Sequence, residues 1–147
     1  MERKNIRIKE YDYKSDGYYF ITICTAKNKP LLERYNKIAE EHLFLLQSKI
    51  GGLKVDYYVI MPTHIHLIVI LEDAELSLGE IIRRYKAFVT KETGVKPFWE
   101  WNYYEHIIRD EKALNKIREY IMLNPLKEKI RFEEIYDYKN CAINRRL

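Results

Sequence analysis

Apolar residues follow two different periods along this chain, and the periods predict where strands and helices lie. β-branched and aromatic residues crowd residues 18–25, 53–61 and 64–71, and turn-forming residues bound these runs. We therefore expect a strand in each of the three segments. Pro62-Thr63 leaves only a two-residue connection between the second and third strands, which indicates a hairpin. A fourth strand is expected at residues 102–108.

Apolar residues spaced three and four apart predict three helices. The first spans residues 38–50 and ends at two glycines, and the second spans residues 78–91 ahead of Gly94. The third begins after Asp110, a good N-cap, and ends at the Asn124-Pro125 step. This order of elements is the ferredoxin-like plan with one helix appended. We expect an α+β fold: an antiparallel sheet with helices on one face and an added C-terminal helix.

Length and composition indicate one globular domain. The 147 residues are 47% hydrophobic, and we expect a single domain over residues 1–147, with residues 1–5 and 128–147 flexible or peripheral. No apolar run approaches the roughly 20 residues of a membrane helix, and the charged N-terminus lacks a signal peptide's apolar stretch. Cys24 and Cys141 lie far apart. These features predict a cytoplasmic protein with no membrane partner.

The positive charge is concentrated in one segment. Residues 83–96 hold five basic residues and one acid, a local excess as large as the net charge of +4 on the whole chain. Such a segment is either a solvated helix face or a surface that binds phosphates. On the second interpretation, Arg83, Arg84, Lys86 and Lys91 are the candidate nucleic-acid-binding residues.

His64 and His66 interrupt an otherwise apolar strand. Residues two apart in a strand project from the same face, with Cα atoms roughly 6.6 Å apart, so both imidazoles could bind one metal ion. They could equally be ordinary strand histidines, half exposed at the end of the sheet. Two of only four histidines lie in this strand, and each needs a partner there.

Tyr120 and Asn124 lie four residues apart on the last predicted helix, beside its apolar stripe. Tyr120 could be an ordinary tyrosine at the rim of the core, and Asn124 an ordinary helix-ending residue. Two imidazoles and an amide oxygen would make an open site suited to Mn²⁺ or Mg²⁺. A phenol attacks only a polarised target, and a phosphodiester held on a divalent ion is such a target.

At these residues the sequence resembles the single-tyrosine HUH transposases (His-hydrophobic-His), and within them the REP-associated tyrosine transposases. The resemblance runs from about Ile6 to Lys127 and is carried by residues 7–13, 17–25, 58–66, 101–109 and 120–127. It implies that His64 and His66 are metal ligands, that Tyr120 is the nucleophile and that Asn124 is a third ligand. The family cleaves single-stranded DNA beside imperfect hairpins and forms a 5′-phosphotyrosine intermediate.

Three positions depart from the family or lack a role. Thr63 stands where the family usually has Asn or Asp, a change expected to leave coordination untouched. Glu128-Lys129 replaces the usual His-Gly, which leaves open the DNA contacts that longer relatives make beyond this point. His106 could be structural or could contact the substrate.

The leading hypothesis is therefore a metal-dependent single-stranded DNA endonuclease and strand transferase, with Mg²⁺ or Mn²⁺ as cofactor. Its partner would be single-stranded or hairpin DNA, and its state is open between monomer and homodimer. One alternative is a domesticated module that binds hairpin or single-stranded nucleic acid without cutting it. The other is a small metal-dependent phosphohydrolase, which would need carboxylates such as Asp56, Glu72 or Asp73 near the histidines.

Overall fold

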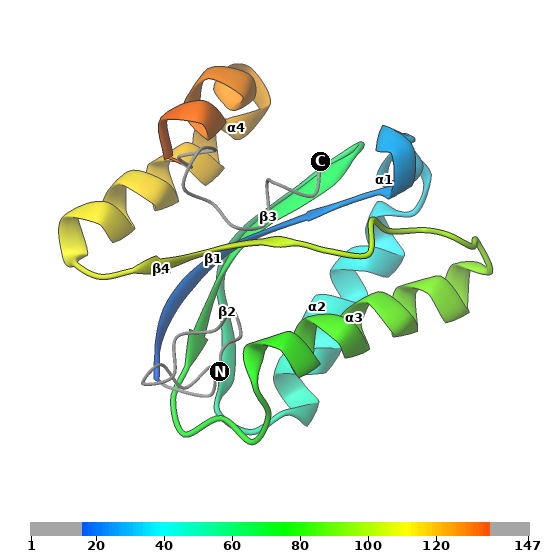
Figure 1. The fold of residues 1–147 in the computed structure, drawn as a ribbon, viewed down its shortest axis with the longest axis horizontal. Helices are drawn as coiled ribbons and strands as arrows, with labels where there is room; N and C mark the ends of the chain where they lie inside the picture. The colour runs from blue at the N-terminus through cyan, green and yellow to red at the C-terminus, as the bar shows by residue number, and fades with distance from the viewer. Residues whose placement is uncertain (1–15, 136–147) are drawn as a thin grey trace, which may run out of the picture.

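A four-stranded antiparallel sheet forms the centre of the protein (Figure 1). The computed structural model describes the backbone of residues 16–135 and the side chains of residues 16–123. The strands are β1 (Gly17–Cys24), β2 (Leu53–Met61), β3 (His64–Leu71) and β4 (Tyr104–Ile108), in the order β2-β3-β1-β4. All four predicted strands and the hairpin are confirmed, and the last strand begins two residues later than expected.

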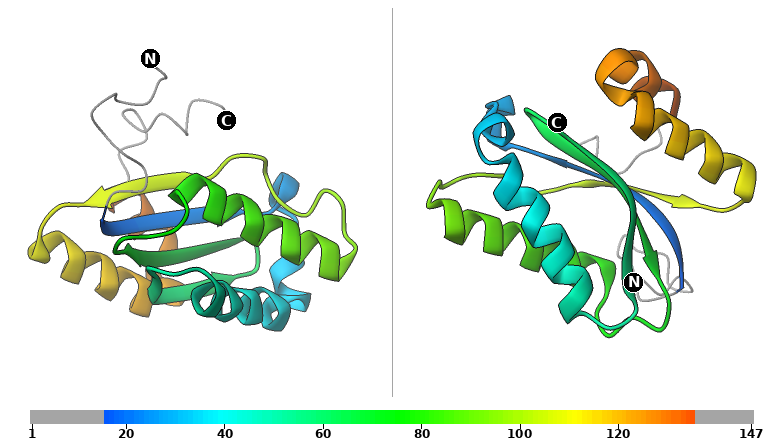
Figure 2. Two further views of the ribbon diagram at one scale, coloured as in Figure 1. Left: turned by 90° about the horizontal axis from the view of Figure 1, so that it is seen from below. Right: turned by 180° about the vertical axis from the view of Figure 1, so that it is seen from behind.

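Helices cover both faces of this sheet. Helices α2 (Asn36–Lys49) and α3 (Leu78–Thr93) pack on one face, and α4 (Glu111–Ile135) lies on the other (Figures 1 and 2). A short 3-10 turn (Ala26–Asn28) and α1 (Leu31–Arg34), which the pattern did not predict, connect β1 to α2. The α+β fold with an appended helix is thus confirmed, and the appended helix takes the opposite face from the other two.

The predicted helix ends lie within two residues of the observed ones except at the end of α4. Asp110 Oδ1 accepts the Ala113 N–H at 2.8 Å, which confirms the N-cap of α4, and Gly94 ends α3 with a left-handed φ of 73°. The expected stop at Asn124-Pro125 is wrong, because α4 continues to Ile135. Proline removes one backbone hydrogen bond and bends a helix, and strong helix formers such as Leu, Lys and Glu follow it here.

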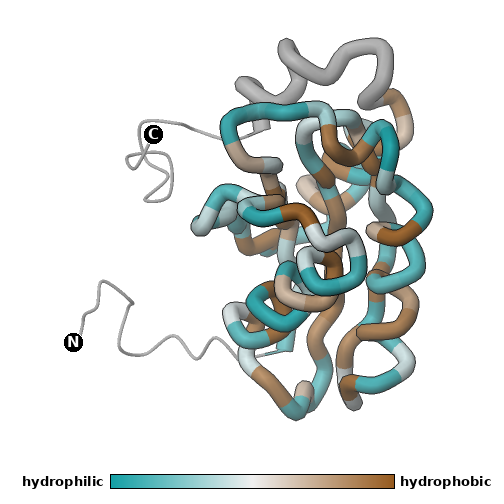
Figure 3. Tube along the Cα trace, turned by 90° about the vertical axis from the view of Figure 1, so that its right-hand side faces the viewer, coloured by the Kyte–Doolittle hydropathy of each residue, from teal (hydrophilic) through white to brown (hydrophobic). Residues whose placement is uncertain are grey.

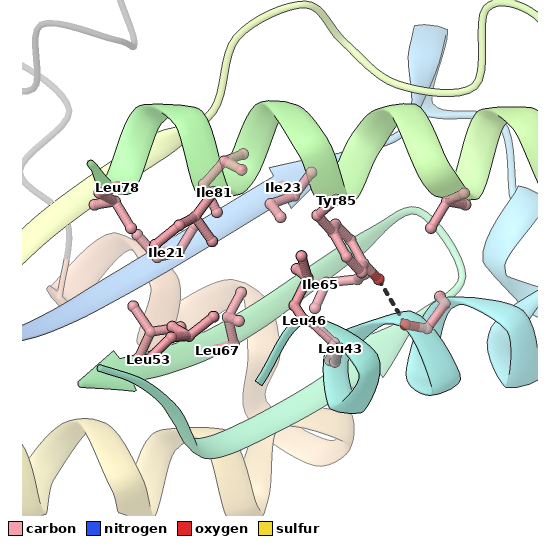
Figure 4. Packing of buried hydrophobic residues seen from close by; sticks show 14 of the residues in the cluster. Ile21, Ile23, Leu43, Leu46, Leu53, Ile65, Leu67, Leu78, Ile81 and Tyr85 are labelled. Atoms are coloured by element: carbon pink, nitrogen blue, oxygen red, sulfur yellow. Dashed lines mark hydrogen bonds between the residues drawn. The ribbon is translucent and has the colours of Figure 1, made fainter. Parts of the chain in front are cut away.

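The larger hydrophobic core lies between the sheet and helices α2 and α3. Figure 3 shows the alternation of hydrophobic and hydrophilic stretches along the chain that creates it. Figure 4 shows Ile21 and Ile23 of β1 and Ile65 and Leu67 of β3 facing the two helices. Tyr85 completes this core, and its hydroxyl donates to the Ala39 carbonyl of α2 at 2.8 Å. This face of the sheet is almost wholly apolar.

A smaller cluster joins α4 to the opposite face. Its members are all at most 9% exposed: Phe20, Ile68, Tyr104, Ile108, Leu114, Ile117, Tyr120 and Ile121. A bulge in β2, between Val55 and Tyr57, adds an ion pair to this contact. Asp56, the extra residue of the bulge, accepts two hydrogen bonds from the Arg118 guanidinium of α4, at 2.8 and 3.0 Å. The sheet therefore holds α4 at both an apolar and a polar contact.

Candidate active site

The hairpin turn determines which face of the sheet the two histidines occupy. Met61 pairs with His64 across the two-residue turn, and the next residue, Ile65, is fully buried in the core under α2 and α3. His64 and His66 therefore project from the opposite face, toward α4. β3 is an interior strand, with β2 on one side and β1 on the other. The predicted shared face of the two histidines is confirmed.

His66 lies in the most enclosed part of this face. Its side chain is 1% exposed, and its Nδ1 lies 2.8 Å from Oγ1 of Thr22, the neighbouring residue on β1. Burial lowers the pKa of His66 well below its usual value, and the charge of nearby His64 lowers it further. The imidazole is therefore neutral near pH 7, the state in which histidine binds metals.

His64 stands at the start of the same strand. Its ring lies edge-on to that of His66, with centroids 4.6 Å apart. Thr63 Oγ1 lies 3.0 Å from Nδ1 of His64, so this threonine contacts the ring directly. Both rings thus have a threonine hydroxyl at Nδ1. When Nδ1–H donates to that oxygen, Nε2 presents its lone pair, which is the usual arrangement behind a metal-binding histidine.

Tyr120 of α4 packs directly on the histidines. Its side chain is 0% exposed, and its ring meets those of His66 and Phe20, with centroids 5.3 and 6.2 Å away. Its hydroxyl lies 3.3 Å from Nε2 of His66. The tyrosine that could have been an ordinary residue at the core's rim is instead fully enclosed, with its phenol at the imidazole.

The donor atoms present here fit part of a divalent metal site. Two imidazoles, each with a threonine hydroxyl at Nδ1, are suitable ligands for a divalent transition-metal ion. Within residues 16–123, no cluster of three or more histidine, cysteine or carboxylate side chains could hold a metal. The side chain of Asn124, the third predicted ligand, lies outside the described residues.

Two characterised or sequenced proteins resemble this chain over most of its length. No family model matches it. An uncharacterized protein of Haemophilus influenzae is 36% identical over 164 aligned positions, which cover 84% of this chain and 88% of the relative. The REP-associated tyrosine transposase of Escherichia coli is 24% identical over 115 positions, covering 78% of this chain and 70% of that protein.

Two solved structures have folds similar to that of this chain. A REP-associated tyrosine transposase bound to a REP hairpin matches 84% of this chain and 75% of its own, with a TM-score of 0.72 and 22% identity. In sequence and in fold, the chain resembles the REP-associated tyrosine transposases. A putative transposase of Deinococcus radiodurans, at 14% identity and a TM-score of 0.53, shares the fold over 79% of this chain. These likenesses support a transposase-like function.

The basic residues predicted to bind nucleic acid lie on α3, on the opposite face of the sheet from the histidines (Figure 1). Arg83 and Arg84 both donate to Glu80, and these bonds lower the pKa of that carboxyl to about 2. Lys86 Nζ donates to two backbone carbonyls, and Lys91 is exposed. The structure therefore does not bring this group to the histidines, and its role in binding nucleic acid stays a prediction.

Three remaining expectations concern acids, His106 and the membrane. Asp56, one of the carboxylates that a phosphohydrolase would need, is paired with Arg118, so the structure gives that alternative no support.

His106 lies on the α4 face, across from Phe20 in the register of β1 and β4, and its role stays open. No helix within residues 16–135 has the length and apolar character to span a membrane.

The sequence analysis assigned no binding role to the segment that connects α3 to β4. This segment carries Trp101, whose side chain is 82% exposed. The signal was present in the sequence, since residues 98–101 (FWEW) place both tryptophans of the chain beside a basic segment.

Proposed function

We propose that this chain is a metal-dependent endonuclease and strand transferase that acts on single-stranded DNA near hairpins through a 5′-phosphotyrosine at Tyr120. The observation that carries the proposal is the 3.3 Å approach of the Tyr120 hydroxyl to Nε2 of His66, beside the ring of His64. The DNA substrate is supported by a relative of the same fold that is described as bound to a REP hairpin. DNA would also be the partner, with the monomer or homodimer state open.

His64 and His66, with Asn124 as a third ligand, would hold Mg²⁺ or Mn²⁺. When bound, such an ion polarises a phosphodiester and lowers the barrier to attack on phosphorus. The chain itself supplies the nucleophile and its orientation. The phenol of Tyr120 loses its proton to water, its oxygen bonds to phosphorus, the bond from phosphorus to the 3′ oxygen breaks, and that oxygen takes up a proton from water. The products are a 5′-phosphotyrosine and a free 3′ hydroxyl, which can later reverse the reaction.

Burial of the nucleophile imposes an order on this reaction. Tyr120 is enclosed between α4 and the sheet, so a phosphodiester can reach its oxygen only after this part of α4 has moved. Arg118, two residues before Tyr120, and its partner Asp56 oppose that movement. Exposure of the nucleophile therefore has to precede its attack on DNA.

The same burial favours a second candidate function. A protein that binds hairpin or single-stranded nucleic acid without cutting it would keep Tyr120 as a core residue, with its hydroxyl satisfied by His66. The two functions differ in one product, the covalent adduct.

The deciding experiment is to incubate the full chain with single-stranded hairpin DNA and Mn²⁺ and to separate the products on a denaturing gel. We expect a covalent protein–DNA adduct, and mass spectrometry of the digested adduct should place the DNA on Tyr120. Tyr120→Phe should abolish the adduct, whereas Tyr104→Phe, a matched change on the same face, should retain it. A DNA-modified peptide containing another tyrosine would reassign the nucleophile. Stable binding with no adduct under any divalent ion would favour the non-cleaving module.

A further inference from the structure

A groove of about 660 Å³ lies between the C-terminal half of α3 and the connection to β4. Figures 1 and 2 show this connection passing the end of β1 near α1. The groove's lining combines aromatic rings (Phe98, Trp99 and Trp101) with the side chains of Lys91 and Lys96. This volume lies within the range of small-molecule binding sites in proteins. None of the site residues discussed above except Lys86 and Lys91 lies in it.

The two tryptophans of the groove have opposite surroundings. Trp99 is 7% exposed, and its indole N–H donates to the Lys86 carbonyl at 3.2 Å, so it belongs to the structure of the groove. Trp101 is 82% exposed. A large apolar ring kept in water at the mouth of a groove is typical of a binding surface.

The backbone on either side of Trp101 is fixed. Lys86 Nζ donates to the carbonyls of Glu100 and Asn102, at 2.8 and 2.9 Å, and these two residues flank Trp101 in sequence. One ammonium group therefore holds the segment that presents the indole. A ligand that stacks on this ring does not have to order the segment first, which lowers the entropic cost of binding.

The charges around the groove favour an anionic ligand. Lys91 and Lys96 make no hydrogen bond or ion pair within the part of the chain that the structure describes, and both side chains are exposed. Glu100 is the acid of the lining, and its Oε2 accepts the Lys27 backbone N–H at 3.1 Å. The ligand then needs a planar apolar part for the indole and a negative group for the lysines.

The groove lies at the end of the sheet that carries His64. The Glu100 N–H donates to the Cys24 carbonyl at 2.9 Å, and Cys24 is the residue paired with His64 across β1 and β3. The segment with Trp101 is thus bonded to the strand next to the candidate active site. A DNA strand held at the histidines can continue past this end of strands β1 and β3.

We propose that this groove binds an unpaired nucleotide of single-stranded DNA, with its base stacked on Trp101 and its phosphates beside Lys91 and Lys96. The inference rests on the proposed function for the identity of the ligand as DNA. An unpaired nucleotide offers both an accessible aromatic face and a charged phosphate, whereas the base faces of a duplex are occupied by stacking.

The test measures the affinity of the full chain for a fluorescein-labelled oligothymidine strand, in EDTA so that no cleavage occurs. Trp101→Ala should weaken this affinity by about 5- to 150-fold, which corresponds to about 1–3 kcal/mol for stacking one base. Trp101→Phe should recover part of the loss. Phe44→Ala is the matched control, because Phe44 is an exposed aromatic residue on α2, outside the groove. This variant should leave the affinity for the oligothymidine strand unchanged.

The lysines have a separate readout. Lys91→Gln or Lys96→Gln should reduce the slope of log affinity against log salt by about 0.7, the value for one phosphate contact on a single strand. Lys37→Gln, on α2, should leave the slope unchanged.

Two results would overturn the inference. The first is an unchanged oligothymidine affinity in Trp101→Ala. The second is a change only in self-association, measured by sedimentation, which would assign the groove to an interface between copies of the chain. Failure of the proposed function looks different, because the protein would then bind the oligonucleotide through Trp101 and yet form no adduct with hairpin DNA and Mn²⁺.

Discussion

The two faces of the sheet are built from the same strands and differ in almost every other respect. The face under α2 and α3 is filled by aliphatic side chains from β1 and β3. The face under α4 holds a smaller apolar cluster, and within it lie the buried polar groups of His66 and Thr22. Alternate residues of one strand therefore belong either to the larger core or to the candidate site. The larger core can maintain the fold while the smaller face keeps polar groups that an efficient core would exclude.

One buried tyrosine on each face makes the contrast sharper. Tyr85 and Tyr120 are both almost wholly buried. The hydroxyl of Tyr85 donates to a backbone carbonyl, and burial raises its pKa, so it stays a neutral structural group. The hydroxyl of Tyr120 meets an imidazole nitrogen instead. The hydroxyl's partner, rather than burial, distinguishes the candidate nucleophile from the core residue.

The largest effect is expected from the histidines of the α4 face. His64→Ala or His66→Ala should abolish DNA cleavage and weaken Mn²⁺ binding by several kcal/mol, while leaving the fold intact. Cleavage at limiting Mn²⁺ and the electron paramagnetic resonance of bound Mn²⁺ measure the two effects. His42→Ala is the control, because His42 lies on α2 and pairs with Glu92. Cleavage at the unmodified rate by either variant would remove the two-histidine site.

The residue between the histidines should show the opposite behaviour. Ile65 is fully buried on the α2 and α3 face, so Ile65→Ala should lower the free energy of unfolding by about 2–5 kcal/mol. Urea denaturation measures this loss. Where the variant remains folded, it should still bind Mn²⁺. A loss of Mn²⁺ affinity in folded Ile65→Ala as large as in His66→Ala would show that the two faces are not separable.

A smaller effect is expected from the threonines behind the rings. Thr22→Val and Thr63→Val remove the hydroxyls at Nδ1 of His66 and His64 and should each weaken Mn²⁺ affinity by about 10- to 100-fold. Thr93→Val on α3 removes a hydroxyl that donates to the Val89 carbonyl and should not change the affinity. Serine at either position should restore much of the binding, and if it does not, the hydroxyl is not what orients the ring.

The smallest effect is on stability and concerns the two tyrosines. Tyr85→Phe and Tyr120→Phe each remove one buried hydroxyl and should each cost about 1 kcal/mol of unfolding free energy. Thermal unfolding provides this comparison. The two variants should then differ in the denaturing-gel assay, where Tyr85→Phe forms the adduct and Tyr120→Phe does not. Equal loss of the adduct in both variants would mean that the effect is structural.

Much of the fold was predictable because local signals agree with the packing. The alternation around His64 and His66, the Asp110 cap and Gly94 each act within a few residues. The end of α4 was not predictable in this way, because the helix continues past Pro125 despite the lost hydrogen bond.

The candidate site was predictable in part for the same reason. The shared face of the histidines follows from the strand period alone. The contacts of His66 with Thr22 and with Tyr120, by contrast, join residues that are 44 and 54 positions apart, so they depend on the tertiary fold. The hydrogen bonds from Lys86 to the carbonyls of residues 100 and 102 also depend on the tertiary fold. The charge pattern alone therefore predicted that Lys86 binds a phosphate.

The two-residue turn at Pro62-Thr63 constrains how this protein can change over evolution. Its length determines that even-numbered residues of β3 face α4 and that Ile65 faces the larger core. A slip of β3 by one residue against its neighbours would exchange the two sets, burying both imidazoles among aliphatic side chains and turning Ile65 toward α4. A lineage can therefore replace side chains here one at a time, but a one-residue slip of β3 would lose the site and the core together.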